Sequence, residues 1–249
     1  MPRTHKSLQR LYIDAPLAPV GTLKLERDQT NYLVNVLRKR PGDEVIVFNG
    51  KDGAWLASIA EAGKKSVSLS LVEQTASQTP QPDLWYGFAP IKAGRLDYMV
   101  QKATEMGVGT IQPVLTQFTQ VKSIKQGRLA ANAIEAAEQC EVLSVPTIAP
   151  EVKLPRLIAD WPQTHAGRAL IFADEAADST SPVNVFEQLD GRPIGVLIGP
   201  EGGFSAEERA LLLKQDFVVP ISLGPRILRA DTAAVAALAV IQSIIGDWR

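Results

Sequence analysis

Two glycine-rich segments near the C-terminal end carry the residue types best suited to binding a ligand. The first reads IGPEGGFSAEE, residues 198–208, and the second reads LGPRILRADTAA, residues 223–234. Each follows an apolar, strand-like run and leads into the start of a helix. Because glycine lets main-chain N–H groups approach a ligand closely, we expect the two turns to face one binding site.

The first turn is rich in glycine, as ligand-binding loops often are. It lacks the motifs of a nucleotide hydrolase. The sequence contains neither GxxxxGK[ST] nor GxGxxG after an early strand, so a phosphate cradle of those types is disfavoured. Ser205 and Glu208 have the spacing of a capping box, which predicts a helix starting at Ser205. Taken alone, the turn could also be a tight connection that binds nothing.

The second turn places two arginines, Arg226 and Arg229, among apolar residues. Apolar side chains beside exposed main-chain groups suit an adenine ring, and arginines suit an anionic partner. Asp231 is close enough in sequence to orient an arginine or to accept a proton. We expect Asp231 or Thr232 to cap the following alanine-rich helix. A surface salt bridge between arginine and aspartate is the alternative.

The C-terminal part of the chain alternates between strand-like and helical segments, which predicts a parallel sheet covered on both faces. The strand-like runs are LWYGFAP, TIQPVL, RALIFAD, PIGVLIG and FVVPISL, and the helical runs are RLDYMVQKATEMG, GRLAANAIEAAEQC, a helix from Ser205 and one from about Thr232 to Ile245. Ligands of such sheets bind beyond the C-terminal ends of the strands. Both glycine-rich turns occupy that position.

Residues 11–72 consist of short alternating runs separated by glycine-rich turns, which predicts a small antiparallel barrel. One helical interruption, TNYLVNVLRKR, should place Tyr32, Leu33, Val36 and Leu37 on one side. Residues 73–82, EQTASQTPQP, lose all periodicity and indicate a linker. The expected organisation is therefore a barrel domain at 1–72, a linker at 73–82 and an α/β domain at 83–249.

Composition limits the remaining possibilities. Formal net charge is -1, but residues 1–40 hold eight Lys and Arg against three Asp and Glu, a local charge of +5, which is compatible with phosphate contacts. Cys140 is the single cysteine of the sequence, so no internal disulfide is expected. With His5 and His165 as the two histidines, the sequence also predicts no zinc-ligand cluster. Cys140 should be a small buried residue on a helix. No apolar run is long enough to span a membrane, so we expect a cytoplasmic protein.

The two turns, in this order, resemble the RsmE family of bacterial methyltransferases, which modify N3 of a uridine in 16S ribosomal RNA. The family reads IGPEGG followed by S-x-x-E, then LG-x-R-[IV]-L-R-x-[ED]-T-A, and both motifs are complete here. KAGRLDYMVQKATEMG is similar to its K-x-x-R-x-[DE] segment, AIEAAEQC to its I-x-x-A-x-EQ helix, and RLYI and NVLRKRPGDEV to its N-terminal domain. The resemblance covers nearly the whole chain.

This resemblance implies a fold of the SPOUT class, in which a PUA-like barrel precedes an α/β domain with a deep C-terminal trefoil knot. It further implies that the two turns form one pocket for S-adenosylmethionine, with S-adenosyl-L-homocysteine as the product. The implied partners are 16S rRNA in the small ribosomal subunit or its precursor and a second copy of the chain in a homodimer.

The residues expected at the site follow from these motifs. As catalytic residues we expect Arg229, to stabilise negative charge on the uracil oxygens, and Asp231, to orient Arg229 or receive the proton. The expected cofactor-binding residues are Leu197, Ile198, Gly199, Glu201, Gly202, Gly203, Leu223, Gly224, Ile227, Leu228 and Thr232.

Four arginines are the expected RNA contacts: Arg3, Arg10, Arg38 and Arg128. Many relatives have a Gly-Arg pair after the EQ helix, where this chain has Glu141 and Val142. Arg128 is the expected substitute for that arginine, because it lies on the same predicted helix.

Two other functions remain open at this point. One is a non-catalytic RNA-binding or assembly factor, against which the two intact motifs argue. The other is a SPOUT methyltransferase that acts on transfer RNA or on another ribosomal nucleotide, which the catalytic motifs alone do not exclude.

Overall fold

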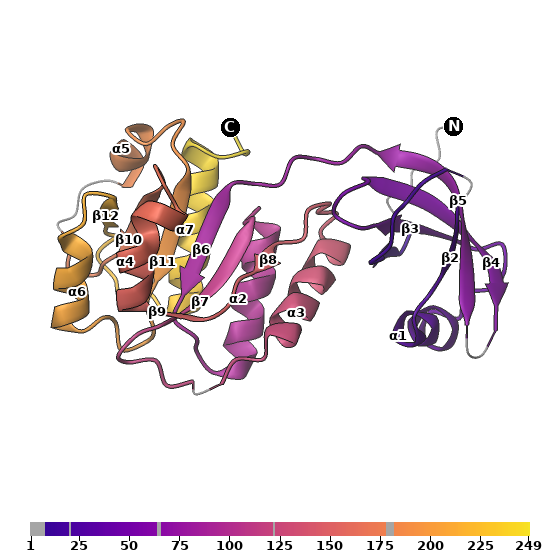
Figure 1. The fold of residues 1–249 in the computed structure, drawn as a ribbon, viewed down its shortest axis with the longest axis horizontal. Helices are drawn as coiled ribbons and strands as arrows, with labels where there is room; N and C mark the ends of the chain where they lie inside the picture. The colour runs from indigo at the N-terminus through magenta and orange to yellow at the C-terminus, as the bar shows by residue number, and fades with distance from the viewer. Residues whose placement is uncertain (1–7, 20, 64–65, 122, 178–181) are drawn as a thin grey trace. The chain divides into compact units, whose positions relative to one another are not determined.

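The computed structural model describes residues 8–19, 21–63, 66–121, 123–177 and 182–249 of the chain. It divides into two compact units, the first comprising Met1–Gln81 with Ala137–Val145 and the second Pro82–Ala136 with Pro146–Arg249 (Figure 1). The sequence pattern assigns residues 137–145 to the C-terminal domain, whereas they belong to the first unit. Ala137 and Leu143 share a core cluster with Ile46 and Phe48, a pairing so distant in sequence that no local pattern shows it.

The first unit is built on a five-stranded sheet in the order β1-β3-β4-β5-β2. Its strands are β1 (Arg10–Tyr12), β2 (Thr22–Lys24), β3 (Glu44–Phe48), β4 (Ala54–Ala62) and β5 (Val67–Ala76). The predicted antiparallel pairing is confirmed for β2, β5, β4 and β3. β1 pairs with β3 in parallel, which the long connection between them permits. β5 runs through Ala76, into the segment predicted as a linker.

The helical interruption has an unexpected geometry. It consists of α1 (Arg27–Asn31) followed by a π-helix, η2 (Tyr32–Val36). Leu33 is fully buried as predicted, but 61% of Val36 is exposed. The prediction that both lie on one side is wrong at Val36, because a π-helix bonds i to i+5 and turns each residue by a smaller angle than the α-helix assumed.

The second unit contains a parallel seven-stranded sheet with the main order β12-β10-β11-β6-β7-β8, while β9 pairs with β7. The strands are β6 (Leu84–Phe88), β7 (Thr110–Leu115), β8 (Thr147–Ile148), β9 (Val152–Lys153), β10 (Ala169–Ala173), β11 (Ile194–Ile198) and β12 (Val218–Ile221). The helices are α2 (Ala93–Glu105), α3 (Gln126–Gln139), α4 (Leu154–Thr164), α5 (Pro182–Glu187), α6 (Ala206–Leu213) and α7 (Ala230–Ile244). All five strand-like runs of the C-terminal part are confirmed as strands.

Helices cover both faces of this sheet (Figure 1). On one face, α4 contributes Leu157 and Trp161 to a core with Trp85 and Phe172, and α6 adds Leu212. The ring of Trp161 meets that of Trp85 edge to face at 5.0 Å. On the other face, α7 packs against α2, α5 and β11. The α/β class with a parallel sheet is confirmed, while the deep knot stays a prediction.

The end of α3 corrects one expectation and supplies a stability prediction. Cys140 follows the last residue of the helix and is exposed, so the prediction of a buried cysteine is wrong. Glu141 comes next with a φ of 59°, a left-handed conformation that usually belongs to glycine after a helix. An L-residue there costs about 1 kcal/mol or more.

Replacing Glu141 with glycine should therefore raise the free energy of unfolding by about 1 kcal/mol. The measurement is urea unfolding of the wild type and of Glu141→Gly. Glu141→Ala is the matched control, since it removes the same charge but keeps the Cβ atom and its strain. Equal stability of the glycine and alanine variants would show that the backbone at Glu141 is not strained.

Candidate active site

One cavity of about 740 Å³ lies in the second unit, beyond the C-terminal ends of β10, β11 and β12. Three segments and two helix positions form its walls: residues 172–177, 198–201 with 203–204, and 221–230, together with Arg209 and Ala233. Because the three strands are parallel neighbours, their C-terminal ends share one edge of the sheet. The two glycine-rich turns therefore meet across one cavity, as their sequence predicts.

Most of the residues expected to bind a cofactor line this cavity. They are Ile198, Gly199, Glu201, Gly203, Leu223, Gly224, Ile227 and Leu228. Leu197 is fully buried behind the wall, in the core that α4 covers. Gly202 and Thr232 lie next to lining residues but outside the wall itself.

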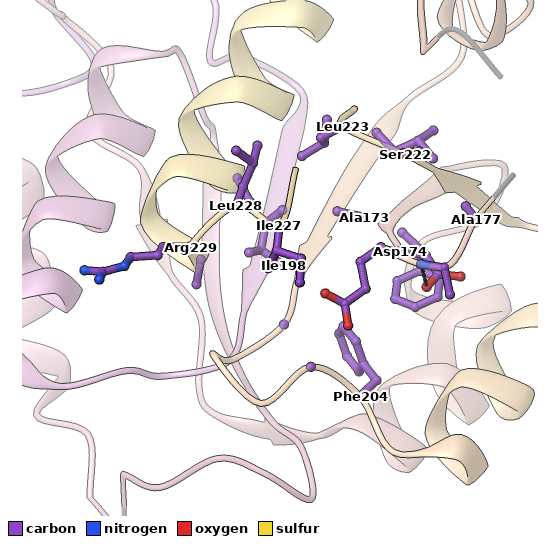
Figure 2. A pocket seen from close by; sticks show the side chains of 18 of the residues that line it. Ala173, Asp174, Ala177, Ile198, Phe204, Ser222, Leu223, Ile227, Leu228 and Arg229 are labelled. Carbon is purple, nitrogen blue, oxygen red and sulfur yellow. Dashed lines mark hydrogen bonds between the residues drawn. The ribbon is translucent and has the colours of Figure 1, made fainter. Parts of the chain in front are cut away.

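The cavity has an apolar side that comes from both turns. Figure 2 shows Ile198, Ile227 and Leu228 grouped on one side and Phe204 on the other. Ile227 is 84% exposed, so this side chain gains most from a ligand that covers it. The turns reach this shape through Gly203 and Gly224, whose φ angles are 68° and 108°, values that disfavour any other residue.

Sequence reasoning missed the third wall of the cavity, residues 172–177. This segment ends β10 and includes Asp174, whose side chain is 5% exposed and accepts a hydrogen bond from Arg209 Nε at 2.9 Å. Asp174 also accepts from the main-chain N–H of Ala176 at 3.1 Å. The sequence shows only that RALIFAD is an apolar run of strand length, and the place of its C-terminal end between those of the two motif strands follows from the strand order in the sheet.

The helix after the first turn begins as predicted. Ser205 is the N-cap of α6 and forms a capping box with Glu208. The Glu208 side chain is buried and also accepts a hydrogen bond from the main-chain N–H of Gln117 at 2.8 Å. This carboxylate connects the start of α6 to the loop after β7. The connection stabilises the position of the first glycine-rich turn, which leads into α6.

The start of α7 differs from the predicted one, while the catalytic roles of Arg229 and Asp231 stay predictions. Arg229, not Asp231 or Thr232, is the N-cap of α7, and Asp231 lies in the first turn, where its Oδ1 accepts from Thr232 N–H at 3.0 Å. The expectation about the cap is wrong because an acidic residue also stabilises a helix start from inside the first turn. Figure 2 shows the Arg229 side chain pointing away from the cavity interior.

The cation nearest to Asp231 comes from a different helix. Arg95, in the first turn of α2, has its Nε 3.8 Å from Asp231 Oδ2, and its Nη1 is 3.7 Å from Glu201 Oε1. Asp231 also affects Tyr86, a fully buried residue of β6. Burial, followed by the charge of Asp231, raises the pKa of the Tyr86 hydroxyl well above its ordinary value.

The expected RNA-binding arginines have different environments. Arg38 is exposed and follows η2 with a φ of 55°. The Arg10 guanidinium is partly buried, with its Cζ 5.0 Å from the centre of the Phe48 ring. Burial lowers the pKa of Arg10, and the charges of Glu141 and Glu138 partly offset that effect. Arg3 lies outside the described residues.

Arg128 is engaged within its own unit. It lies on α3, and its guanidinium forms a two-point ion pair with Asp97, with Nε 2.9 Å from Oδ1 and Nη2 bonded to Oδ2. The hydrogen bond to Asp97 raises the pKa of Arg128. About half of the side chain remains exposed (54%).

In the described ranges, no group of three or more His, Cys, Asp or Glu could hold a metal ion. None of the helices in the part of the chain that the structure describes combines the length and the apolar character needed to cross a bilayer.

Comparison with known proteins places both units in one kind of protein. A family model described as RNA methyltransferase domain matches residues 77–242, and one described as RNA methyltransferase PUA domain matches residues 25–72. The chain is 33% identical over 234 residues to the ribosomal RNA small subunit methyltransferase E of Rickettsia conorii, covering 94% of each chain. It is 30% identical to the Synechocystis protein of the same name, covering 90% of this chain and 74% of the other.

Solved structures agree over nearly the full length. The ribosomal RNA small subunit methyltransferase E of Neisseria gonorrhoeae, solved with bound S-adenosyl methionine, superposes with a TM-score of 0.83 at 26% identity and covers 97% of this chain and 100% of its own. A Legionella pneumophila methyltransferase with bound SAM superposes with a TM-score of 0.82 at 30% identity, covering 95% and 97%. This chain therefore belongs to the RNA methyltransferase family whose members are named ribosomal RNA small subunit methyltransferase E.

Proposed function

We propose that this protein transfers the methyl group of S-adenosylmethionine to N3 of one uridine in 16S rRNA of the small ribosomal subunit. The observation that carries the proposal is the cavity between the two glycine-rich turns, with Asp231 and Arg229 on the helix start beside it. The names of the relatives support ribosomal RNA of the small subunit as the substrate. The position N3 rests on the resemblance of the two motifs.

The cavity fits S-adenosylmethionine in size and chemistry. Its volume of about 740 Å³ is within the range of small-molecule sites. Leu223, Ile227 and Leu228 offer an apolar surface for the adenine ring, and the turns around Gly199 and Gly224 expose main-chain groups to it. When bound, this cofactor supplies an electrophilic methyl group, which leaves behind the thioether S-adenosyl-L-homocysteine.

The residues of the chain manage charge and position in this reaction. Uracil N3 carries a proton at neutral pH, and the new N–C bond forms with the electron pair that remains when the proton leaves. In the proposal Asp231 orients Arg229 or receives this proton, and Arg229 stabilises negative charge on the uracil oxygens. Because N3 is hidden in base pairing, the target uridine must be unpaired or turned out of its stack.

The N-terminal unit serves in this proposal as a positioning arm for RNA, through phosphate contacts that carry no sequence information. Arg38 should make one such contact, because it is exposed and lies in the most basic part of the chain. Arg10 and Arg128 are weaker candidates, since their guanidinium groups already contact Phe48 and Asp97.

Replacing Arg38 with alanine should weaken RNA binding and reduce the slope of log K against log salt by about 0.7 to 0.9. The measurement is filter binding of a 16S rRNA fragment at several salt concentrations. Arg156→Ala removes a similarly exposed arginine, from α4, and should leave the slope unchanged. An unchanged slope in the Arg38 variant would make this residue an ordinary surface charge.

The decisive test of the function is transfer of labelled methyl from S-adenosylmethionine to small ribosomal subunits that lack this modification, followed by nucleoside analysis. Label in N3-methyluridine at one site is the expected result. Label in another nucleoside or in transfer RNA would move the activity to another RNA substrate. Cofactor binding without any transfer would favour a non-catalytic RNA-binding factor.

The proposal includes a homodimer that works in the cytoplasm and a knotted C-terminal segment, as the resemblance implies. Sedimentation equilibrium tests the dimer directly. A monomer with full activity would overturn that part of the proposal while leaving the reaction intact.

A further inference from the structure

An arginine outside both glycine-rich motifs lies against the acidic residue of each. Arg95 belongs to the first turn of α2. This turn contains no acidic residue. A cation in the first turn of a helix is unfavourable, because the helix dipole places partial positive charge there. The stability of α2 therefore does not explain an arginine at this position.

The surroundings of Arg95 offer another explanation. Its guanidinium approaches Glu201, which comes from the first turn and lines the cavity, at 3.7 Å, and Asp231, from the start of α7, at 3.8 Å. Without a cation between them, two carboxylates from separate segments would repel each other. Arg95 joins the two motifs electrostatically at the edge of the cavity.

Two arginines that line the cavity are poorly placed for this task. The Arg229 side chain points away from the cavity interior (Figure 2), and Arg209 is bonded to Asp174 on the opposite wall. Among the ion pairs formed by the described residues, Arg95 is the arginine that pairs with Asp231.

We propose that Arg95 is a positioning residue for methyl transfer, which is anchored by Glu201 and holds Asp231 in the arrangement that receives the target base. This inference rests on the proposed function. The ion pairs are partly exposed, with 40% of the Arg95 side chain, 46% of Glu201 and 20% of Asp231 accessible. Partly exposed pairs stabilise a fold very little, so their loss should affect the reaction and leave the fold nearly unchanged.

The test compares Arg95→Ala and Arg95→Lys with the wild type, using small ribosomal subunits as substrate. Arg95→Ala should lower kcat about 10- to 100-fold, because a displaced reacting group costs up to about 10²-fold. The Kd for S-adenosylmethionine and the urea midpoint should stay at their wild-type values. Arg95→Lys should recover part of kcat, because it keeps the charge but loses the planar fork. Arg156→Ala is the control for loss of an ion-paired arginine.

A double-mutant cycle with Asp231→Asn then distinguishes positioning from an independent effect. If Arg95 acts through Asp231, the double variant should be little slower than Asp231→Asn alone. Multiplicative losses, or a kcat of Arg95→Ala equal to that of the wild type, would overturn the inference. A wild-type enzyme without methyl transfer would instead overturn the proposed function, so the two failures are distinguishable.

Discussion

Replacing Arg229 with alanine should lower kcat about 100- to 1,000-fold and leave the affinity for S-adenosylmethionine nearly unchanged. The size of the loss is that of removing one group that stabilises developing charge in a transition state. Cofactor binding should persist because the Arg229 side chain points away from the cavity interior (Figure 2). Steady-state kinetics with small ribosomal subunits and calorimetric titration with the cofactor measure the two quantities.

Two further variants sharpen this expectation. Arg229→Lys keeps the positive charge without the planar guanidinium, so it should retain an intermediate rate. Arg156→Ala on α4 should have wild-type kinetics, since Arg156 pairs only with Asp160, one turn away on its own helix. A near-normal rate for Arg229→Ala would remove this residue from the mechanism and leave Arg95 as the arginine beside Asp231.

Replacing Gly199 with alanine should weaken S-adenosylmethionine binding about 10- to 100-fold or more. A Cβ atom at this position would lie 2.6 Å from Phe204 Cε2 and 3.1 Å from Cδ2, far inside van der Waals contact. The Phe204 ring cannot withdraw freely, because it packs edge to face on Phe172 at 5.0 Å. Since both rings line the cavity, relief of the clash must change its shape, and overpacking of this kind costs about 1 to 3 kcal/mol.

The measurement is the shift in melting temperature on addition of the cofactor, which reports its Kd by mass action. Gly127→Ala is the matched control. Gly127 lies in the first turn of α3, and an added Cβ atom there would meet nothing within 4 Å. The control should bind the cofactor normally and gain slightly in stability from the better helix propensity of alanine. Normal binding by Gly199→Ala would show that Phe204 is not part of the cofactor site.

The sequence predicts local features of this molecule well, because local physics determines them. Strong apolar runs identify β6, β7, β10, β11 and β12, and the Ser205 and Glu208 spacing places the start of α6. In contrast, the sequence pattern does not predict α4, because Pro155 and Pro162 interrupt the apolar periodicity of this helix. A proline is tolerated in the first turn of a helix, where its missing N–H would have no partner anyway.

Long-range features could not be predicted from the sequence. The pairing of Arg95 with Asp231 joins residues more than a hundred positions apart, and the packing of Ala137 and Leu143 with β3 also joins distant parts of the chain. The wall at residues 172–177 depends on β10 lying between β11 and β12. A pattern of residue types predicts which segments form strands. The order of these strands in the sheet results from the packing of the whole unit.

This strand order also determines when the site can come into existence. β11 and β12, which carry the two glycine-rich turns, lie on either side of β10, and α7, which begins directly after the second turn, ends at Ile244 of 249 residues. Because proteins are synthesised from the N-terminus, β10, β11, β12 and the start of α7 must all leave the ribosome before the cavity closes. A ligand that binds only the closed cavity stabilises the finished molecule alone. The cofactor thus discriminates chains that contain the start of α7 from chains that stop before it, and the cellular concentration of the cofactor sets how strongly the final folding step is favoured.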